Sequence, residues 1–273
     1  MITSKDNELI KETAKLIKSA KARKDKHLFV AEGLRLCRDA AESGAHIVFF
    51  LYTGQAAEKN KDDFALIRSV ADKSEEISRE LYNKISDTNS PQGFLCAIDT
   101  GSNTAMSEIK SGGKYAALEN IQDPSNLGTI LRTAEALGID GVILSHDCCD
   151  IYSPKVVRGS MGAVFRLPFM QTEDFTAWIQ ECTATGVSTY ASTPHEAENI
   201  RQIDFSGGGI MLIGNEGNGL KSETIEACTR RVKIPMFGRA ESLNAAAAAA
   251  ILMYELMNHS ERKQGGEFFG RKY

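Results

Sequence analysis

The stretch Asn126-Leu-Gly-Thr-Ile-Leu-Arg-Thr-Ala134 lies at the centre of the pattern that decides the fold of this 273-residue chain. It places a glycine and an arginine in the opening of a predicted helix, directly behind a predicted strand and a polar loop. Two more polar loops follow, Gly214-Asn-Glu-Gly-Asn-Gly219, which is rich in glycine, and Glu241-Ser-Leu-Asn244. We expect the three loops to form one active site.

Apolar segments of strand length alternate with amphipathic segments around this stretch. The pattern predicts strands at 115–119, 141–145, 187–191, 209–214 and 231–235, and helices at 127–138, 173–185, 221–228 and 243–258. Such apolar strands, separated by helices, indicate a mainly parallel sheet with both faces covered. Ligands of these sheets bind in loops at the carboxyl ends of the strands, where the three loops are predicted to lie.

A shorter alternation of predicted strands and helices precedes this region of the chain. Strands are predicted at 28–30, 47–52 and 93–98, and helices at 6–22, 32–41, 60–72 and 75–84. The segment Asp99–Gly113 is rich in Gly, Ser and Thr and only weakly periodic, which is typical of a domain boundary. The sequence therefore predicts an α/β protein of two domains, residues 1–105 and 106–273.

The composition is that of an ordinary globular protein, with 42% hydrophobic and 25% charged residues. No signal peptide or membrane span is predicted, so we expect a cytoplasmic protein. The net charge of −4 argues against a surface that binds nucleic acid everywhere. Residues 1–26, however, carry eight Lys or Arg against four acids, which fits either a solvated helix face or an RNA contact.

The six cysteines form no C-x-x-C pair and have no histidine at zinc-ligand spacing. We interpret most of them as small buried hydrophobic residues of a reducing compartment. No metal site is expected.

Each loop has both a structural and a functional interpretation. Arg132, predicted one turn into a helix, is either a clamp for phosphate or carboxylate or a surface ion pair. The glycines of 214–219 allow a ligand to approach the backbone, but their order does not fit a dinucleotide-binding loop. Ser242 and Asn244 are explained by capping of the next helix alone. In the segment 153–168, the basic residues Lys155, Arg158 and Arg166 lie among small residues and suit either phosphate binding or a plain connection.

Taken together, the three loops resemble the signatures of SpoU/TrmH-type RNA methyltransferases of the SPOUT superfamily. Three groups of residues carry the resemblance: Asn126, Gly128, Arg132 and Ala134; Ile213 to Gly217 with Gly219-Leu220; and Ile234-Pro235 with Ser242-Leu-Asn244. The resemblance is strongest over 115–258. The third signature usually continues S-L-N-V, whereas Ala245 follows Asn244 here.

The resemblance implies a trefoil-knotted domain that binds S-adenosyl-L-methionine as a homodimer and methylates a ribose 2′-hydroxyl in RNA. It implies that the cofactor pocket is lined by Gly214, Asn215, Glu216, Ile234, Met236 and Leu243. It also implies catalytic roles for Arg132, Asn126, Glu216, Ser242 and Asn244. Arg132 matches the family's proposed base, although a guanidinium rarely gives up its proton and a phosphate clamp satisfies the same geometry.

The first hundred residues resemble the ribosomal-protein-like RNA-binding domain that is often fused in front of the catalytic one. Phe29-Val-Ala-Glu-Gly33 and Ser90-Pro-Gln-Gly93 carry this looser match. The expected RNA-binding residues are Glu32, Gly33, Arg35, Lys155 and Arg158. The leading hypothesis is a methyltransferase acting on ribosomal (23S) RNA; the alternatives are a tRNA 2′-O-methyltransferase and a non-catalytic RNA-binding or ribosome assembly factor.

Overall fold

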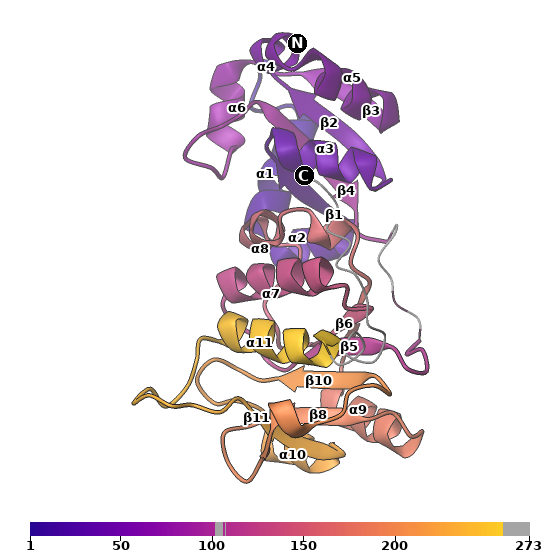
Figure 1. The fold of residues 1–273 in the computed structure, drawn as a ribbon. Coiled ribbons are helices and arrows are strands. Elements are labelled where there is room, and N and C mark those ends of the chain that lie inside the picture. The colour runs from indigo at the N-terminus through magenta and orange to yellow at the C-terminus, as the bar shows by residue number, and fades with distance from the viewer. Residues whose placement is uncertain (102–105, 107, 259–273) are drawn as a thin grey trace. The chain divides into compact units, whose positions relative to one another are not determined.

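The computed structural model describes residues 1–101, 106 and 108–258. They form two compact units. The first contains the described residues among 1–105 together with 127–132 and 149–166, and the second contains 106–126, 133–148 and the described residues from 167 onward. Each unit is built around its own β-sheet (Figure 1).

The sheet of the first unit is small and mixed. Its strands follow the order β1 (Leu28–Glu32), β4 (Phe94–Asp99), β2 (Ile47–Tyr52) and β3 (Ala71–Glu76). Strand β4 is antiparallel to both neighbours, whereas β2 and β3 are parallel. The helices are α1 (Glu8–Lys18), α2 (Ala20–Lys26), α3 (Leu34–Glu42), α4 (Gly54–Lys59), α5 (Lys61–Val70), α6 (Arg79–Ile85) and α8 (Pro154–Ser160), with a 3₁₀ turn at Ala163–Phe165.

Two sequence predictions for this unit are wrong in detail. The helix expected at 6–22 is broken at Ser19, whose backbone is extended and whose hydroxyl accepts a hydrogen bond from the backbone N–H of Ala22. The helix expected at 75–84 begins only at Arg79, because residues 71–76 form strand β3. This strand has the sequence ADKSEE, and its near absence of apolar residues gave no strand signal.

The core of the first unit lies between the sheet and the inner faces of α1 and α6. The buried residues that pack together there include Leu16 and Ile17 from α1, Leu81 and Tyr82 from α6, and Val30, Phe49, Leu51, Leu95 and Ala97 from the strands. The hydroxyl of Tyr82 donates a hydrogen bond to the carbonyl of Phe94, so this buried polar group is paired.

The second unit is a parallel sheet of seven strands. Their order is β7 (Phe169–Thr172), β6 (Gly141–Ser145), β5 (Lys114–Leu118), β10 (Gly209–Ile213), β8 (Thr189–Ser192), β11 (Arg230–Lys233) and β9 (Glu198–Asn199). Every pairing is parallel. This confirms the predicted α/β fold with a parallel sheet; β7 and β9, of four and two residues, were not predicted.

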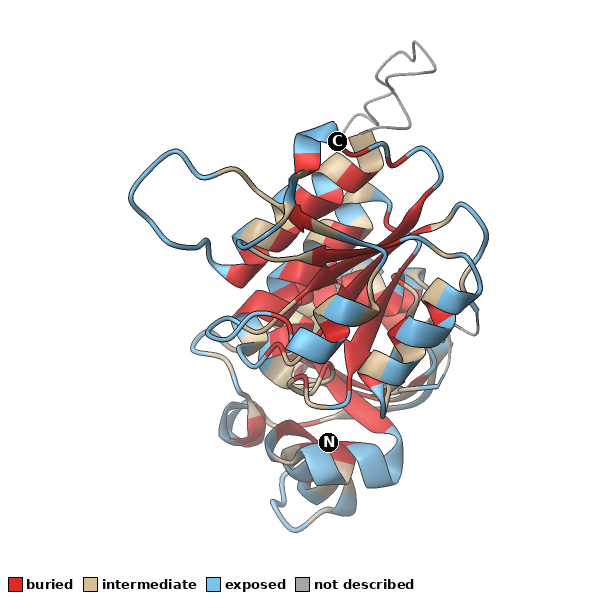
Figure 2. Cartoon of the chain, turned by 90° about the horizontal axis from the view of Figure 1, so that it is seen from below, coloured by how far each residue is buried: buried red, intermediate tan, exposed pale blue. Residues whose placement is uncertain are grey.

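Helices cover both faces of this sheet (Figure 1). Helix α11 (Ala245–Asn258) packs on β5 and β10, while α9 (Phe175–Ala184) and α10 (Ser222–Ala227) pack together on the other face. Strand residues alternate accordingly, since Ile210 and Leu212 share a core cluster with Phe175 and Ile179 of α9. Figure 2 shows the strands as buried and the helices as exposed along their outer faces.

Two further elements complete the description. Helix α7 spans Pro124–Leu137, with Asp123 as N-cap and Gly138 in the left-handed conformation as C-cap. A 3₁₀ turn lies at Ile200–Gln202. Within the residues that the structure describes, no helix is long and apolar enough to cross a membrane.

Candidate active site

The candidate site lies at the carboxyl ends of β5, β10 and β11. Strands β5 and β10 are direct neighbours, and only β8 separates β10 from β11. Because all of these strands are parallel, the loops that follow them emerge at one edge of the sheet. The three loops singled out from the sequence are therefore brought together by the fold.

Glu119, the residue after β5, anchors the loop that follows β10. Its side chain is 1% exposed, and its two carboxylate oxygens accept hydrogen bonds from the backbone N–H of Lys221 at 2.8 Å and the hydroxyl of Thr224 at 2.7 Å. The ammonium of Lys221 also lies 3.6 Å from Asp147 Oδ2. A buried carboxylate that is hydrogen-bonded on both oxygens fixes the end of the glycine-rich loop rigidly.

Asn120 turns the chain away from β5 with a φ of 55°, a left-handed conformation that asparagine adopts more readily than most residues. Its N–H donates to Ser145 Oγ at 2.8 Å, and its carbonyl accepts from Asn215 Nδ2 at 2.8 Å. Its side-chain oxygen accepts from Gln122 Nε2 at 2.5 Å. The turn thus links the first loop to the second.

The carboxylate of Glu216 is the centre of the site. Oε1 accepts hydrogen bonds from Asn126 Nδ2 at 2.9 Å and from the N–H of Asp123 at 3.1 Å, and Oε2 accepts from the N–H of Gln122 at 3.3 Å. Partial burial alone would raise the pKa of Glu216, but the donors, Asn126 foremost, outweigh it and lower the pKa below its ordinary 4.5. Glu216 is therefore a stable anion at neutral pH.

Asn126 connects this anion to the third loop. Asn126 itself is 7% exposed, and its side-chain oxygen accepts a hydrogen bond from Asn244 Nδ2 at 3.0 Å. The oxygen of Asn244 in turn accepts from the backbone N–H groups of Ala246 and Ala247, so Asn244 also caps α11. The capping interpretation and the site interpretation of Asn244 are thus compatible.

The Gly214–Gly219 loop is a closed turn. Asn215 and Gly219 form an isolated antiparallel bridge, and the Asn215 side-chain oxygen accepts hydrogen bonds from the N–H groups of Gly217 and Asn218. A Cβ on Gly214 would lie 2.2 Å from backbone atoms of Gly219 and Leu220, so only glycine fits there. Beyond β11, the apolar side chains of Met236 and Leu243 are 40% and 37% exposed, which leaves apolar surface open beside half-buried Ile234.

Two of the expected catalytic residues lie outside the network. Arg132 is exposed, and in the described part of the chain it has no hydrogen bond or ion pair. The prediction that it lies one turn into its helix is wrong, because α7 begins at Pro124, eight residues earlier. At about 100° per residue, Arg132 points about 120° away from Asn126 around the helix axis. Ser242 is exposed and forms no hydrogen bond with another described residue.

Glu32, one of the residues expected to bind RNA, forms hydrogen bonds within the protein. It is 7% exposed, and its carboxylate accepts hydrogen bonds from the N–H of Asp87 at 2.9 Å, from Thr88 Oγ1 at 3.1 Å and from the hydroxyl of Ser86. Glu32 was expected to bind RNA, but its burial among these donors makes it the support of the 86–88 turn. Gly33 has a φ of 103°, so it is required by backbone conformation.

The three basic residues of that set differ in their surroundings. Arg158 Nη1 lies 2.9 Å from Asp87 Oδ2, and its side chain is 33% exposed, so it joins α8 to the 86–88 turn. Arg35 and Lys155 are exposed, at the starts of α3 and α8 respectively.

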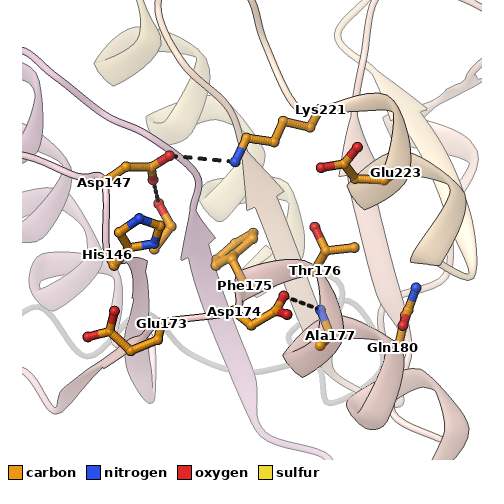
Figure 3. A pocket seen from close by; sticks show the side chains of 11 residues that line it. His146, Asp147, Glu173, Asp174, Phe175, Thr176, Ala177, Gln180, Lys221 and Glu223 are labelled. Atoms are coloured by element: carbon orange, nitrogen blue, oxygen red, sulfur yellow. Dashed lines mark hydrogen bonds and ion pairs between the residues drawn. The ribbon is translucent and has the colours of Figure 1, made fainter.

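A cleft of about 470 Å³, lined in part by Lys221, lies at the same edge of the parallel sheet. Figure 3 shows His146 and Asp147 after β6, Glu173 and Asp174 after β7, and Lys221 before α10 around it. None of these residues was singled out from the sequence, because isolated charged residues in loops resemble ordinary surface.

Comparison with known families identifies the second half of the chain. Residues 113–254 match the model of the SpoU rRNA Methylase family. The chain belongs to this family. Residues 7–96 of this SpoU family member match a second model, the MRM3-like substrate binding domain. The family, the α/β fold class and the RNA methyltransferase activity predicted from the sequence are thereby confirmed.

Similar proteins extend over almost the whole length of this SpoU methylase. A relative from Synechocystis, described as an uncharacterized tRNA/rRNA methyltransferase, is 34% identical over 93% of this chain and 92% of its own. The 23S rRNA (guanosine(2553)-2′-O)-methyltransferase RlmP of Bacillus subtilis is 28% identical over 93% and 98%. An AdoMet-bound rRNA methyltransferase from Sinorhizobium meliloti superposes with a TM-score of 0.83 at 32% identity, covering 94% of this chain and 97% of that one.

Proposed function

We propose that this protein transfers a methyl group from S-adenosyl-L-methionine to a ribose 2′-hydroxyl of 23S rRNA. The support is its membership of the SpoU rRNA methylase family, its similarity to RlmP over nearly the whole chain, and its similarity to an AdoMet-bound rRNA methyltransferase. The observation that carries the proposal is the Glu216–Asn126–Asn244 network, which joins all three signature loops through hydrogen bonds of 2.9 and 3.0 Å.

The residues beyond β10 and β11 fit the cofactor. The exposed apolar side chains of Met236 and Leu243 offer surface for the apolar parts of a nucleoside, and Gly214, directly after β10, belongs to the closed turn that fixes the shape of this loop. Ile234 and Asn215 complete the proposed set with Glu216, whose lowered pKa keeps a negative charge that favours a positively charged sulfonium. When bound, the cofactor supplies the electrophilic methyl group.

The protein's contribution to the reaction is alignment and charge. We assign Arg132 to holding an RNA phosphate next to the reacting ribose with two parallel hydrogen bonds. With Arg132 as the clamp, the proton of the 2′-hydroxyl passes to the bound RNA phosphate, and from there to solvent, as the oxygen attacks the methyl group. Asn126, Glu216 and Asn244 hold the loops in register, and the exposed hydroxyl of Ser242 is available to the ribose.

The remaining parts of the proposal concern organisation. Residues 1–105 form the RNA substrate-binding domain and residues 106–273 the knotted methyltransferase domain. The protein acts as a homodimer, for which the exposed side chains of Ile251 (39%) and Tyr254 (53%) on α11 provide an apolar face. Arg132 faces away from Asn126 on α7. In the proposed homodimer, Arg132 of one copy can therefore reach the active site of the other copy.

Incubation with S-adenosylmethionine labelled in the methyl group tests the proposal. We expect label in deproteinised 23S rRNA, and nuclease digestion should release it as a 2′-O-methylated nucleoside. Label in tRNA alone would favour the tRNA alternative. A protein that binds the cofactor yet labels neither RNA would contradict the enzymatic assignment, and label on bases would contradict the ribose assignment.

A further inference from the structure

The first two helices present four lysines that no other described residue neutralises. Lys15 and Lys18 belong to α1, and Lys21 and Lys24 to α2. All four are exposed, and none has an ion pair or hydrogen bond with a described acid. Basic side chains that a protein leaves unpaired in solvent are free to bind an anionic partner.

The other charges of these helices are largely committed to contacts within the protein. Lys11 pairs with Asp6 at 3.2 Å, and Lys26 pairs with Glu12 at 3.4 Å. Glu8 and Asp25 are exposed acids without an ion pair in the described part of the chain. Four free lysines against two free acids leave this surface with a net positive charge, although the whole chain carries −4.

Arg23 holds the two helices in a fixed relationship. Its side chain is 7% exposed; Nη1 donates to the carbonyls of Leu16 and Ile17 at the end of α1, and Nε and Nη2 bind Asp150 Oδ2 at 2.7 and 2.6 Å. The Lys26–Glu12 pair brings the end of α2 back beside α1. The buried arginine is thus structural, whereas the four lysines are displayed on a rigid helical pair.

The spacing of the lysines suits a nucleic acid backbone. Lys15 and Lys18 are three residues apart, which places them on one face of α1 about 4.5 Å apart along the helix axis. Lys21 and Lys24 repeat the three-residue interval on α2. A row of point charges at this spacing can neutralise successive phosphates without reading the bases.

A membrane surface is a poorer partner for these helices. An amphipathic helix that inserts into lipid needs an exposed apolar face. The apolar face of α1 is buried, with Ile10 3%, Leu16 1% and Ile17 8% exposed, because it packs into the core of the first unit. None of the large exposed hydrophobic side chains in the described chain belongs to α1 or α2.

We propose that Lys15, Lys18, Lys21 and Lys24 form a second RNA contact, which binds the phosphate backbone of the rRNA substrate away from the reacting nucleotide. This contact rests on the proposed rRNA methyltransferase function and adds the surface by which the substrate is held. It supplies affinity and salt dependence rather than sequence specificity. Its loss should raise the KM for RNA and leave the chemical step intact.

The test compares two variants with the same change in net charge. One carries Lys15→Gln, Lys18→Gln, Lys21→Gln and Lys24→Gln. The matched control carries Lys59→Gln, Lys61→Gln, Lys73→Gln and Lys84→Gln, which are exposed lysines elsewhere in the first unit. Glutamine keeps helix propensity close to that of lysine, and thermal unfolding followed by circular dichroism checks that both variants fold.

Binding of in vitro-transcribed 23S rRNA is measured over a range of salt concentrations, and methyl transfer is measured at varied RNA concentration. For the α1–α2 variant we expect at least a tenfold weaker Kd at low salt, a salt slope reduced by about 3, and an unchanged kcat and cofactor affinity. The control should stay within about twofold of the wild type.

Equal behaviour of the two variants would overturn the second contact, even if the wild type methylates RNA normally. A variant with lower kcat but unchanged RNA affinity would also overturn it. The binding arm needs no turnover, so the failure of the methyltransferase proposal, seen as wild-type protein that binds RNA but does not methylate it, is a separate result.

Discussion

The side-chain oxygen of Asn126 accepts a hydrogen bond from Nδ2 of Asn244 at 3.0 Å, across 118 positions of sequence. The Asn126 amide nitrogen is at the same time used by Glu216. The Asn126 side chain therefore joins an anion on the second loop to the helix cap on the third. Exchanging the positions of its amide oxygen and nitrogen would break both hydrogen bonds.

Replacing the two asparagines singly and together should show this coupling. We expect Asn126→Ala and Asn244→Ala each to lower the free energy of unfolding by about 1 to 2 kcal/mol, because a partly buried hydrogen bond or a helix cap is lost. The loss in the free energy of unfolding of the double variant should be smaller than the sum of the losses of the two single variants. Urea unfolding measures all three, Ser242→Ala serves as the control with no effect, and strict additivity would contradict a direct bond.

Glu216 should impose a pH dependence on stability. Its pKa is lowered in the folded protein, so its contribution is fully present above the unfolded value near 4.5 and is lost as the pH falls through the lower, folded pKa. Glu216→Gln should therefore be less stable than the wild type at pH 7, and the difference in the free energy of unfolding should narrow as the pH falls below 4.5. Urea unfolding of both proteins at pH 7 and over this acidic range measures the difference. A difference that does not change with pH would mean that the charge of Glu216 contributes nothing to stability.

Substitutions at Asn120 separate the effect of backbone conformation from the effect of its side-chain hydrogen bond. Its φ of 55° costs a residue such as alanine about 1 to 2 kcal/mol, whereas glycine adopts it freely. We expect Asn120→Gly to keep cofactor affinity within a few fold and Asn120→Ala to weaken it more, as measured by isothermal titration. Equal losses in both variants would instead assign the effect to the bond between Asn120 Oδ1 and Gln122.

Gly128 tests the contact between α7 and α8. Alanine is the better helix former by about 1 kcal/mol, so propensity alone predicts a more stable protein. A Cβ at Gly128, however, would lie 3.0 Å from both Cα of Gly159 and the carbonyl oxygen of Val156. Backbone atoms cannot move aside cheaply, so we expect Gly128→Ala to lower the melting temperature; Ala136→Gly, on an exposed face of α7, provides a comparison of propensity without the clash.

Arg132→Ala should reduce kcat for methyl transfer at least about 100-fold while cofactor affinity stays within a few fold, because in the proposed mechanism the guanidinium holds an RNA phosphate and does not contact the cofactor. Arg132→Lys keeps the charge but not the two parallel hydrogen bonds, so it should recover only part of the activity. Labelled-methyl transfer and cofactor titration measure the two effects. A collapse of cofactor affinity would make Arg132 a structural residue.

The sequence predicted most of the parallel sheet because its strands are short apolar runs bounded by glycine and polar residues, as in Gly209–Ile213. It also predicted that Asn126, Glu216 and Asn244 share one site, since loops after parallel strands meet at one edge. It did not predict their partners. Nothing in the sequence distinguishes buried Glu119 or Glu32 from a surface acid, because burial depends on which distant donors the fold brings to them.

The same limit explains the errors in the helices. The break at Ser19 is stabilised by a single hydroxyl and by Arg23, which reaches across to Asp150, and neither leaves a local pattern. The predicted position of Arg132 within its helix failed because the Asp123-Pro124 start lies earlier than the first apolar residue of the periodic run. Local capping residues decide such boundaries more sharply than periodicity does.

The double use of Asn244 has a consequence for biosynthesis. Helix α11 begins with a cap whose amide is held by a residue in the first loop, so its first turn reaches its final form only after the strands that precede it have assembled. A nascent chain released before residue 244 would contain Asn126 and Glu216 but not the third partner. The three-residue network can therefore form only after the chain has been synthesised beyond Asn244. Products truncated before that residue are expected to be inactive rather than partly active.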